Sequence, residues 1–101
     1  PLAHEKLFDK AARNTRLSKN WIYGVARQES AFMYDARSPV GATGLMQLMP
    51  ATAKNVSRRL RIKYSSKKLL DPDYNVKLGS NYLKTLLKQY KGNRVLATAA
   101  N

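Results

Sequence analysis

The stretch WIYGVARQESAFMYDARSPVGATGLMQLMP, residues 21–50, decides the fold of this chain. Its first ten residues place three apolar side chains and one carboxylate at the i, i+3, i+4 and i+7 spacing of a single helix face, and these residues are Ile22, Val25, Ala26 and Glu29. A charge on an apolar helix stripe is costly, because burial removes its hydration. Glu29 is therefore the first candidate for a functional residue.

Glu29 is expected at the end of its helix, because the sequence after Ser30 loses helical periodicity and contains Pro and Gly. Desolvation on the apolar face and the negative end of the helix dipole both disfavour the ionised carboxylate. A carboxylic acid kept protonated in this way can act as the general acid that glycoside cleavage requires. The residues leave open an alternative, in which Glu29 reaches solvent or pairs with Arg27 or Arg37.

Helix signals flank this stretch on both sides. Residues 4–14 place apolar side chains on one side of a surface helix, and Ser18 is a suitable N-cap for the next helix. Asp71 followed by Pro72 is typical of a helix start, and Gly92 is a suitable C′ residue. These signals predict a long helix that occupies most of the sequence between Pro72 and Gly92.

Three glycines predict close packing of the backbone. Gly79 lies inside the long predicted helix, where glycine costs about 1 kcal/mol relative to Ala, so we expect another helix to lie against it. Gly41 and Gly44 lie in a loop, where they suit a positive φ angle or the close passage of another group. A further helix is predicted from Pro50, with Ala53, Val56 and Leu60 on its inner face.

The composition predicts one small domain, spanning residues 1–101, and an anionic partner. The chain has 19 Lys and Arg against 6 Asp and Glu, a net charge of +13, which suits nucleic acid, anionic lipid or a cell-wall polymer. The basic residues are spread over all segments without a nucleic-acid-binding motif, which argues against nucleic acid. No apolar run reaches the length of a membrane span. The chain has no cysteine, and His4 is its only histidine, so no metal site is predicted.

Several motifs in order carry a resemblance to a known family. Glu29-Ser30 is followed by SPVGATGLMQLMPATA at residues 38–53, by LLDPDYNVKLGSNYLKTLLKQYKGN at residues 69–93 and by Ala99-Ala100-Asn101. Together they resemble the catalytic domain of the soluble lytic murein transglycosylases, the bacterial SLT family, over nearly the whole chain. The resemblance implies an all-α domain with a lysozyme-like fold of the goose-type/SLT kind.

The same resemblance implies an enzyme and its site. Glu29 would protonate the oxygen that links N-acetylmuramic acid to N-acetylglucosamine in peptidoglycan, then deprotonate the muramic C6 hydroxyl to give a 1,6-anhydro end. The implied partners are peptidoglycan glycan strands, the implied location is the periplasm or bacterial cell envelope, and no metal or organic cofactor is implied. The residues that the resemblance implies for substrate binding are Ser30, Gln47, Met49 and Asn101.

The chain departs from the family pattern near its end. The family motif is AYN, so the resemblance implies a tyrosine where this chain has Ala100, and a further C-terminal helix that this sequence lacks. Two alternatives therefore stay open. One is a non-catalytic murein-binding fragment. The other is a hydrolytic lysozyme, which needs a second carboxylate about 5 to 10 Å from Glu29, and the candidates for it are Asp35, Asp71 and Asp73.

Overall fold

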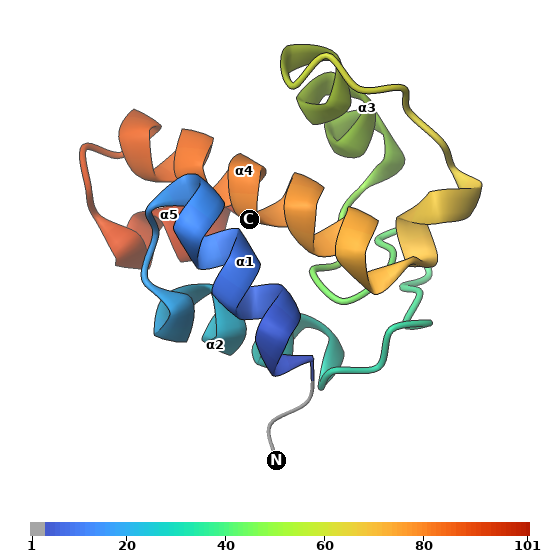
Figure 1. Ribbon diagram of the computed structural model, residues 1–101, viewed down its shortest axis with the longest axis horizontal. Helices are drawn as coiled ribbons and strands as arrows, with labels where there is room; N and C mark the ends of the chain where they lie inside the picture. Colours follow the sequence, from blue (N-terminus) through green and yellow to red (C-terminus); the bar gives the residue numbers. More distant parts are fainter. Residues whose placement is uncertain (1–3) are drawn as a thin grey trace.

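The computed structural model describes residues 4–101, and in this range the chain is all-α. Strand-like pairing is limited there to isolated bridges in the loop between α2 and α3. Figure 1 shows α4 crossing the molecule, with α1 and α2 on one side of it and α3 on the other. The helices are α1 (Glu5–Thr15), α2 (Lys19–Ser30), α3 (Pro50–Arg59), the 3-10 helix η1 (Lys67–Leu70), α4 (Pro72–Gln89) and α5 (Arg94–Ala100).

Helices α1 and α2 form the first part of the core. The Ser18 hydroxyl accepts a hydrogen bond from the Trp21 N–H at 3.3 Å, which confirms the predicted N-cap of α2. Phe8 on α1 is fully buried, and its ring meets that of Tyr23 edge-on, with 5.0 Å between centroids. These contacts fix α2, and hence the direction in which its last turn points.

Ion pairs also join the two helices at their surface. The Lys19 Nζ on α2 lies 2.8 Å from a carboxylate oxygen of Asp9 and 3.0 Å from one of Glu5, both on α1. The hydrogen bond to Asp9, followed by that to Glu5, holds the pKa of Lys19 above its ordinary value. The ammonium group is exposed, so this cluster orients α1 against α2 more than it stabilises them.

Helix α4 begins as predicted and ends earlier than predicted. The Asp71 carboxylate accepts from the Asp73 N–H at 2.9 Å, and Pro72 is the first helical residue. At the other end the left-handed turn takes two residues, Lys91 and Gly92, and the Gly92 N–H donates to the Leu87 carbonyl at 2.8 Å. Gly92 is therefore the second residue after the C-cap, and the helix ends at Gln89.

Gly79 in α4 marks a close approach, but not by a helix. A Cβ atom at this position would lie 2.5 Å from Met46 Sδ and 2.8 Å from Met46 Cβ. Met46 belongs to the loop between α2 and α3, so the expected neighbouring helix is wrong and the expected close packing is confirmed. The absence of a side chain at Gly79 lets this loop sit directly on α4.

A second cluster of buried side chains lies beneath α3. Pro50 is its first residue, and Ala53 and Val56 are buried on its inner face, as predicted. They pack with Leu48, Leu69 and Leu78. Among the described residues, no helix combines the length and apolar character that a membrane crossing requires.

Candidate active site

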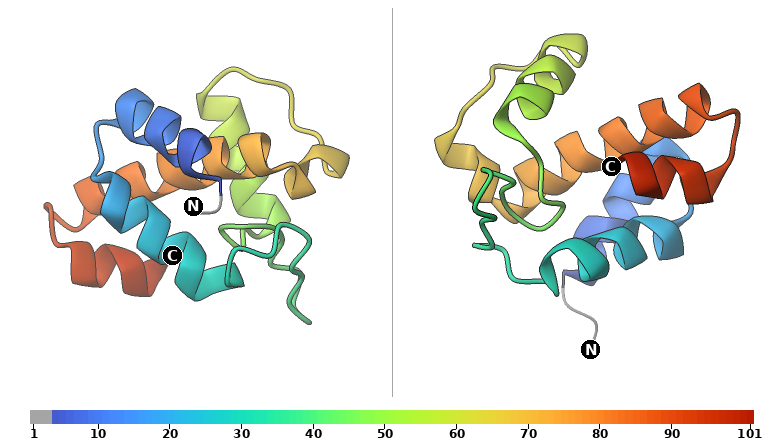
Figure 2. Two further views of the ribbon diagram at one scale, coloured as in Figure 1. Left: turned by 60° about the horizontal axis from the view of Figure 1, so that its bottom comes forward. Right: turned by 180° about the vertical axis from the view of Figure 1, so that it is seen from behind.

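A pocket of about 420 Å³ lies where five segments meet. They are the end of α2, the loop between α2 and α3, the start of α3, the middle of α4 and the end of α5. The C-terminus marked in Figure 2 lies at this junction. The lining residues are Glu29, Ser38, Ala42, Gln47, Leu48, Met49, Thr52, Tyr82, Ala100 and Asn101.

Glu29 lines this pocket from the last turn of α2, but its predicted burial is wrong. Ile22 and Ala26 are buried as expected, and the buried stripe then continues to Ser30, one turn after Ala26, rather than to Glu29. Glu29 is consequently exposed at the pocket. It forms no ion pair with Arg27 or with Arg37, so the predicted structural pairing is also absent for these described residues.

The Glu29 carboxylate has one neighbour that comes from the far end of the chain. Asn101 Nδ2 donates a hydrogen bond to Glu29 Oε2 at 3.1 Å. The other end of the same amide, Asn101 Oδ1, is buried and has no hydrogen-bond partner among residues 4–101. A buried acceptor without a donor is unusual in a folded protein, so the amide beside Glu29 is only partly satisfied within the described chain.

Gln47 uses both of its amide hydrogens to hold the loop that forms one wall. Its Nε2 donates to the carbonyl oxygens of Ala36 and Gly44, both at 2.9 Å. Gln47 is one of the residues that the resemblance implies for substrate binding, but both of its N–H groups are occupied within the chain, and only its Oε1 acceptor remains for a sugar. Met49, 41% exposed, adds an apolar surface beside it.

Asn75 holds the same loop from below, a role that is not evident from its place in the sequence. Its side chain is fully buried in α4 and makes three hydrogen bonds. Nδ2 donates to Thr43 O at 2.9 Å and to Leu69 O at 2.8 Å, while Oδ1 accepts from the Met46 N–H at 2.8 Å. An asparagine inside a helix is unfavourable by propensity, which marks the position as unusual but does not reveal its partners.

Gly44 has the close contact that the sequence predicted for it. Its φ angle is +79°, and a Cβ atom would lie 2.3 Å from Asn75 Nδ2 and 2.9 Å from the Leu69 carbonyl oxygen. The neighbouring Gly41 has a φ angle of +100°. Glycine is therefore required at Gly44 both by backbone conformation and by the space that Asn75 occupies.

Ser30 lies apart from the other predicted site residues. It is buried, and its hydroxyl donates to the Ala26 carbonyl within α2 at 2.9 Å. It does not line the pocket, whereas Gln47, Met49 and Asn101 do. Tyr82 on α4 also lines the pocket and was missed, although it stands in the quoted NYL motif. Its phenol shares the pocket with Ala100, where the family pattern has tyrosine.

Glu29 is the only carboxylate among the described residues that line the pocket. Asp71 and Asp73 line a different groove, and Asp71 is the N-cap of α4. Asp35 is exposed in the loop after α2 and does not line the pocket either. None of the three candidates for a second carboxylate lines this pocket.

Fold and site together define a small lysozyme-like, all-helical domain with one carboxylate in its pocket. The family model described as the transglycosylase SLT domain matches residues 6–100, and the chain belongs to this family. It is 40% identical over 102 residues to the soluble lytic murein transglycosylase of Escherichia coli K12, covering 99% of this chain and 16% of that protein. A putative soluble lytic murein transglycosylase of Haemophilus influenzae is 39% identical, with 99% and 17% covered.

Solved structures agree with this family. An inactive mutant of lytic transglycosylase Slt from Pseudomonas aeruginosa matches with a TM-score of 0.95 and 52% identity. The 70-kDa soluble lytic transglycosylase of Escherichia coli matches with a TM-score of 0.92 and 40% identity. Each match covers 99% of this chain and 16% of the other, and these likenesses confirm the predicted all-α, lysozyme-like fold.

Proposed function

We propose that this chain is the catalytic domain of a peptidoglycan lytic transglycosylase, with Glu29 as its catalytic residue. The observation that carries the proposal is the single carboxylate in the pocket. Hydrolysis by a lysozyme uses two carboxylates about 5 to 10 Å apart. A reaction in which one carboxylate works twice, and in which the sugar supplies its own nucleophile, needs only Glu29.

The proposed reaction uses no water, because a hydroxyl group of the sugar itself is the nucleophile. The Glu29 carboxyl donates its proton to the oxygen between C1 of N-acetylmuramic acid and N-acetylglucosamine, and the C1–O bond breaks. The resulting Glu29 carboxylate takes the proton of the muramic C6 hydroxyl, and O6 bonds to C1. The products are an N-acetylglucosamine hydroxyl end and a 1,6-anhydromuramic end, and Glu29 returns to its acid form.

Asn101 is a suitable hydrogen-bond partner for Glu29, which serves first as an acid and then as a base. Its Nδ2 donates to the Glu29 carboxylate, and after rotation of the amide its Oδ1, which has no partner among residues 4–101, would accept from the protonated carboxyl. In this proposal Gln47 Oε1 accepts from an acetamido N–H or a hydroxyl, and Met49, which is partly exposed, packs against a pyranose ring. The geometry does not favour a direct role for Ser30, because its hydroxyl is bonded inside α2.

The proposed setting follows from the substrate. The relatives named above are murein transglycosylases, so peptidoglycan glycan strands are the proposed partner and the periplasm or cell envelope is the proposed location. Residues 1–101 are proposed to act as one SLT-type domain. The chain spans 16% of the Escherichia coli relative, so the activity proposed here is that of this domain alone.

The variant Glu29→Gln tests the proposal. It should lower the rate of anhydromuropeptide release by at least ~100-fold, because an amide cannot transfer the proton. Binding of a chitin oligosaccharide and the melting temperature should stay close to those of the parent chain. Asp35→Asn is the matched control, since it makes the same change at an exposed carboxylate outside the pocket. Anhydro products from the Glu29→Gln variant would reject the assignment of Glu29.

Ala100 favours a second candidate, a domain that binds murein without cleaving it. Ala100 lines the pocket together with Glu29, and the family pattern has a phenol at this position. Under the primary proposal the parent chain cleaves peptidoglycan, and Ala100→Tyr raises kcat by ~10-fold through better placement of the substrate. If the folded parent binds murein without releasing anhydro products and Ala100→Tyr restores their release, the second candidate describes this chain.

A further inference from the structure

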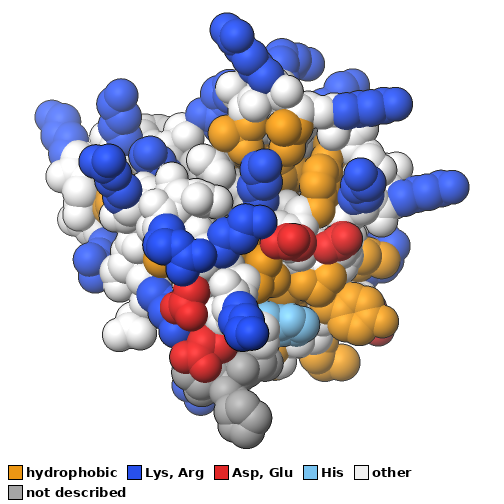
Figure 3. Space-filling view, in the orientation of Figure 1, with side chains coloured by type: hydrophobic (Ala, Val, Ile, Leu, Met, Phe, Trp, Pro, Cys, Tyr) orange, Lys and Arg blue, Asp and Glu red, His pale blue; other side chains and the backbone are white. Residues whose placement is uncertain are grey.

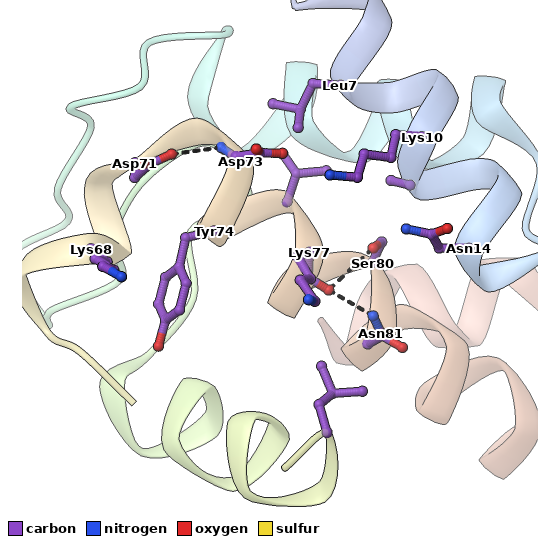
Figure 4. Close-up of a pocket in the computed structure, with 13 residues that line it drawn as sticks. Leu7, Lys10, Asn14, Lys68, Asp71, Asp73, Tyr74, Lys77, Ser80 and Asn81 are labelled. Atoms are coloured by element: carbon purple, nitrogen blue, oxygen red, sulfur yellow. Dashed lines mark hydrogen bonds between the residues drawn. The ribbon is translucent and has the colours of Figure 1, made fainter. Parts of the chain in front are cut away.

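A second and larger groove lies on another side of α4 from the pocket of Glu29. Its volume is about 680 Å³, within the usual range for small-ligand sites. Adjacent residues of α4 separate the two hollows, because Asn81 lines the groove and Tyr82 lines the pocket. Figure 4 shows the groove, with Lys10 and Asn14 contributed by α1 and Lys77 and Asn81 by α4.

The groove carries charges of both signs, and its lysines have no structural partner in the described chain. Lys10, Lys68 and Lys77 line it, and none of them forms an ion pair with an acid of residues 4–101. Of its acids, Asp71 is the N-cap of α4 and Asp73 lies in the first turn, and a carboxylate at either place is favourable for the helix itself. The two acids therefore have a structural role at the start of α4, whereas no ion pair within the described chain uses the charges of the three lysines.

One wall of the groove is held in place by Tyr74. The Tyr74 hydroxyl accepts from the Ser65 N–H at 2.9 Å and donates to the Lys63 carbonyl at 3.2 Å. This pins the segment between α3 and η1, which brings Lys68 to the groove. Residues 50–70 contain seven of the nineteen basic residues and none of the six acids. Figure 3 shows Lys and Arg side chains bordering this face of the molecule.

We propose that this groove is a second binding site that takes an acidic peptide, namely the peptide stem of a peptidoglycan strand. Its carboxylates would pair with Lys10, Lys68 and Lys77, and Asp71 and Asp73 would receive the free amine of a diamino acid. The two aspartates disfavour a polyphosphate such as nucleic acid. The choice of partner rests on the proposed function. Because α4 lies between the groove and the pocket, the peptide would bind apart from the bond that is cleaved.

The test is an NMR titration of the isotope-labelled chain of residues 1–101 with a free stem peptide, L-Ala-γ-D-Glu-diaminopimelate-D-Ala. A chitin oligosaccharide is titrated separately to report on the pocket of Glu29. The test variant is Lys10→Gln/Lys68→Gln/Lys77→Gln. The matched control is Lys54→Gln/Lys84→Gln/Lys88→Gln, which removes the same charge from exposed lysines that line neither hollow.

The proposal expects the peptide to shift amide signals of the groove. It also expects at least a tenfold weaker affinity in the test variant, a change below twofold in the control, and unchanged sugar binding in both. Equal weakening in the two variants would show a diffuse charge effect and overturn the proposal. So would peptide shifts confined to the pocket, no peptide binding, or stronger binding of a short DNA strand to the groove. Groove shifts that grow with protein concentration alone would assign the groove to a second copy. If the parent chain binds the peptide in the groove but neither binds the sugar nor cleaves peptidoglycan, the result counts against the proposed function and not against the groove.

Discussion

At the scale of single residues, Asn75 shows how a buried polar side chain can build a site that it does not touch. Its three hydrogen bonds join α4 to the loop of Met46 and to the end of η1. That loop carries Gln47 and Met49 into the pocket. The side chain is fully buried, so its partners have no access to water if it is removed. Asn75 is therefore a positioning residue for the loop.

We expect Asn75→Ala to destabilise the domain by about 2 kcal/mol or more, because it leaves the Met46 N–H and the Leu69 carbonyl without a partner, while the Thr43 carbonyl keeps the bond from the Leu48 N–H. Urea denaturation measures the loss. The control is Asn81→Ala on the same helix, whose side chain donates only to the carbonyl of Lys77 one turn earlier. It should cost less than about 1 kcal/mol. A similar loss in both variants would contradict the clamping role of Asn75.

The residue scale also shows what sequence reasoning could reach. Helical spacing and the family motif both pointed to Glu29 as the candidate, because they depend on residues local in sequence, whereas its contact with Asn101 joins residues far apart in the chain. The predicted burial of Glu29 was wrong, because the buried face of α2 continues through Ser30 instead. The role of Asn75 could not be derived, because its partners are distant in sequence and their approach depends on the folded loop.

At the scale of elements, α4 is the helix on which the rest of the domain is assembled. Its Gly79 receives Met46 from the loop, and its Asn81 and Tyr82 border two separate hollows. The start of α4 was predictable from Asp71 and Pro72 because capping is a local effect. The close approach at Gly79 was predicted, but the neighbour was expected to be a helix and is Met46 of the loop.

Gly79→Ala tests this packing. The new Cβ would meet Met46 Sδ and Cβ at 2.5 and 2.8 Å, so we expect a loss of about 1 to 3 kcal/mol in the free energy of unfolding. Gly24→Ala in α2 is the matched control, because nothing lies within 4 Å of its new methyl group. It should stabilise the domain by about 0.5 to 1 kcal/mol.

Thermal and urea unfolding of the two glycine variants give the comparison directly. Opposite signs of the two changes are the expected result. Stabilisation by both substitutions would show that helix propensity outweighs the contact with Met46, and that the loop can move away from α4 without cost.

At the scale of the whole molecule, the domain presents two hollows on different sides of α4. The pocket of Glu29 is closed by segments from both halves of the chain, as the bond between Asn101 and Glu29 shows. The groove is bordered by basic side chains whose charge the fold does not use. The class of fold was expected from the family resemblance and is confirmed, whereas the anionic partner expected from the composition stays a prediction. The sequence did not predict the groove, which exists only once α1, α4 and the segment after α3 are packed.

The most direct test of the central claim is digestion of purified peptidoglycan by residues 1–101 in water labelled with heavy oxygen, followed by mass analysis of the released muropeptides. The account predicts products with 1,6-anhydromuramic ends, each lighter by one water than the hydrolytic product and free of the heavy label. Reducing ends that carry the label would contradict it, because they would show attack by water and hence a lysozyme with a second catalytic group.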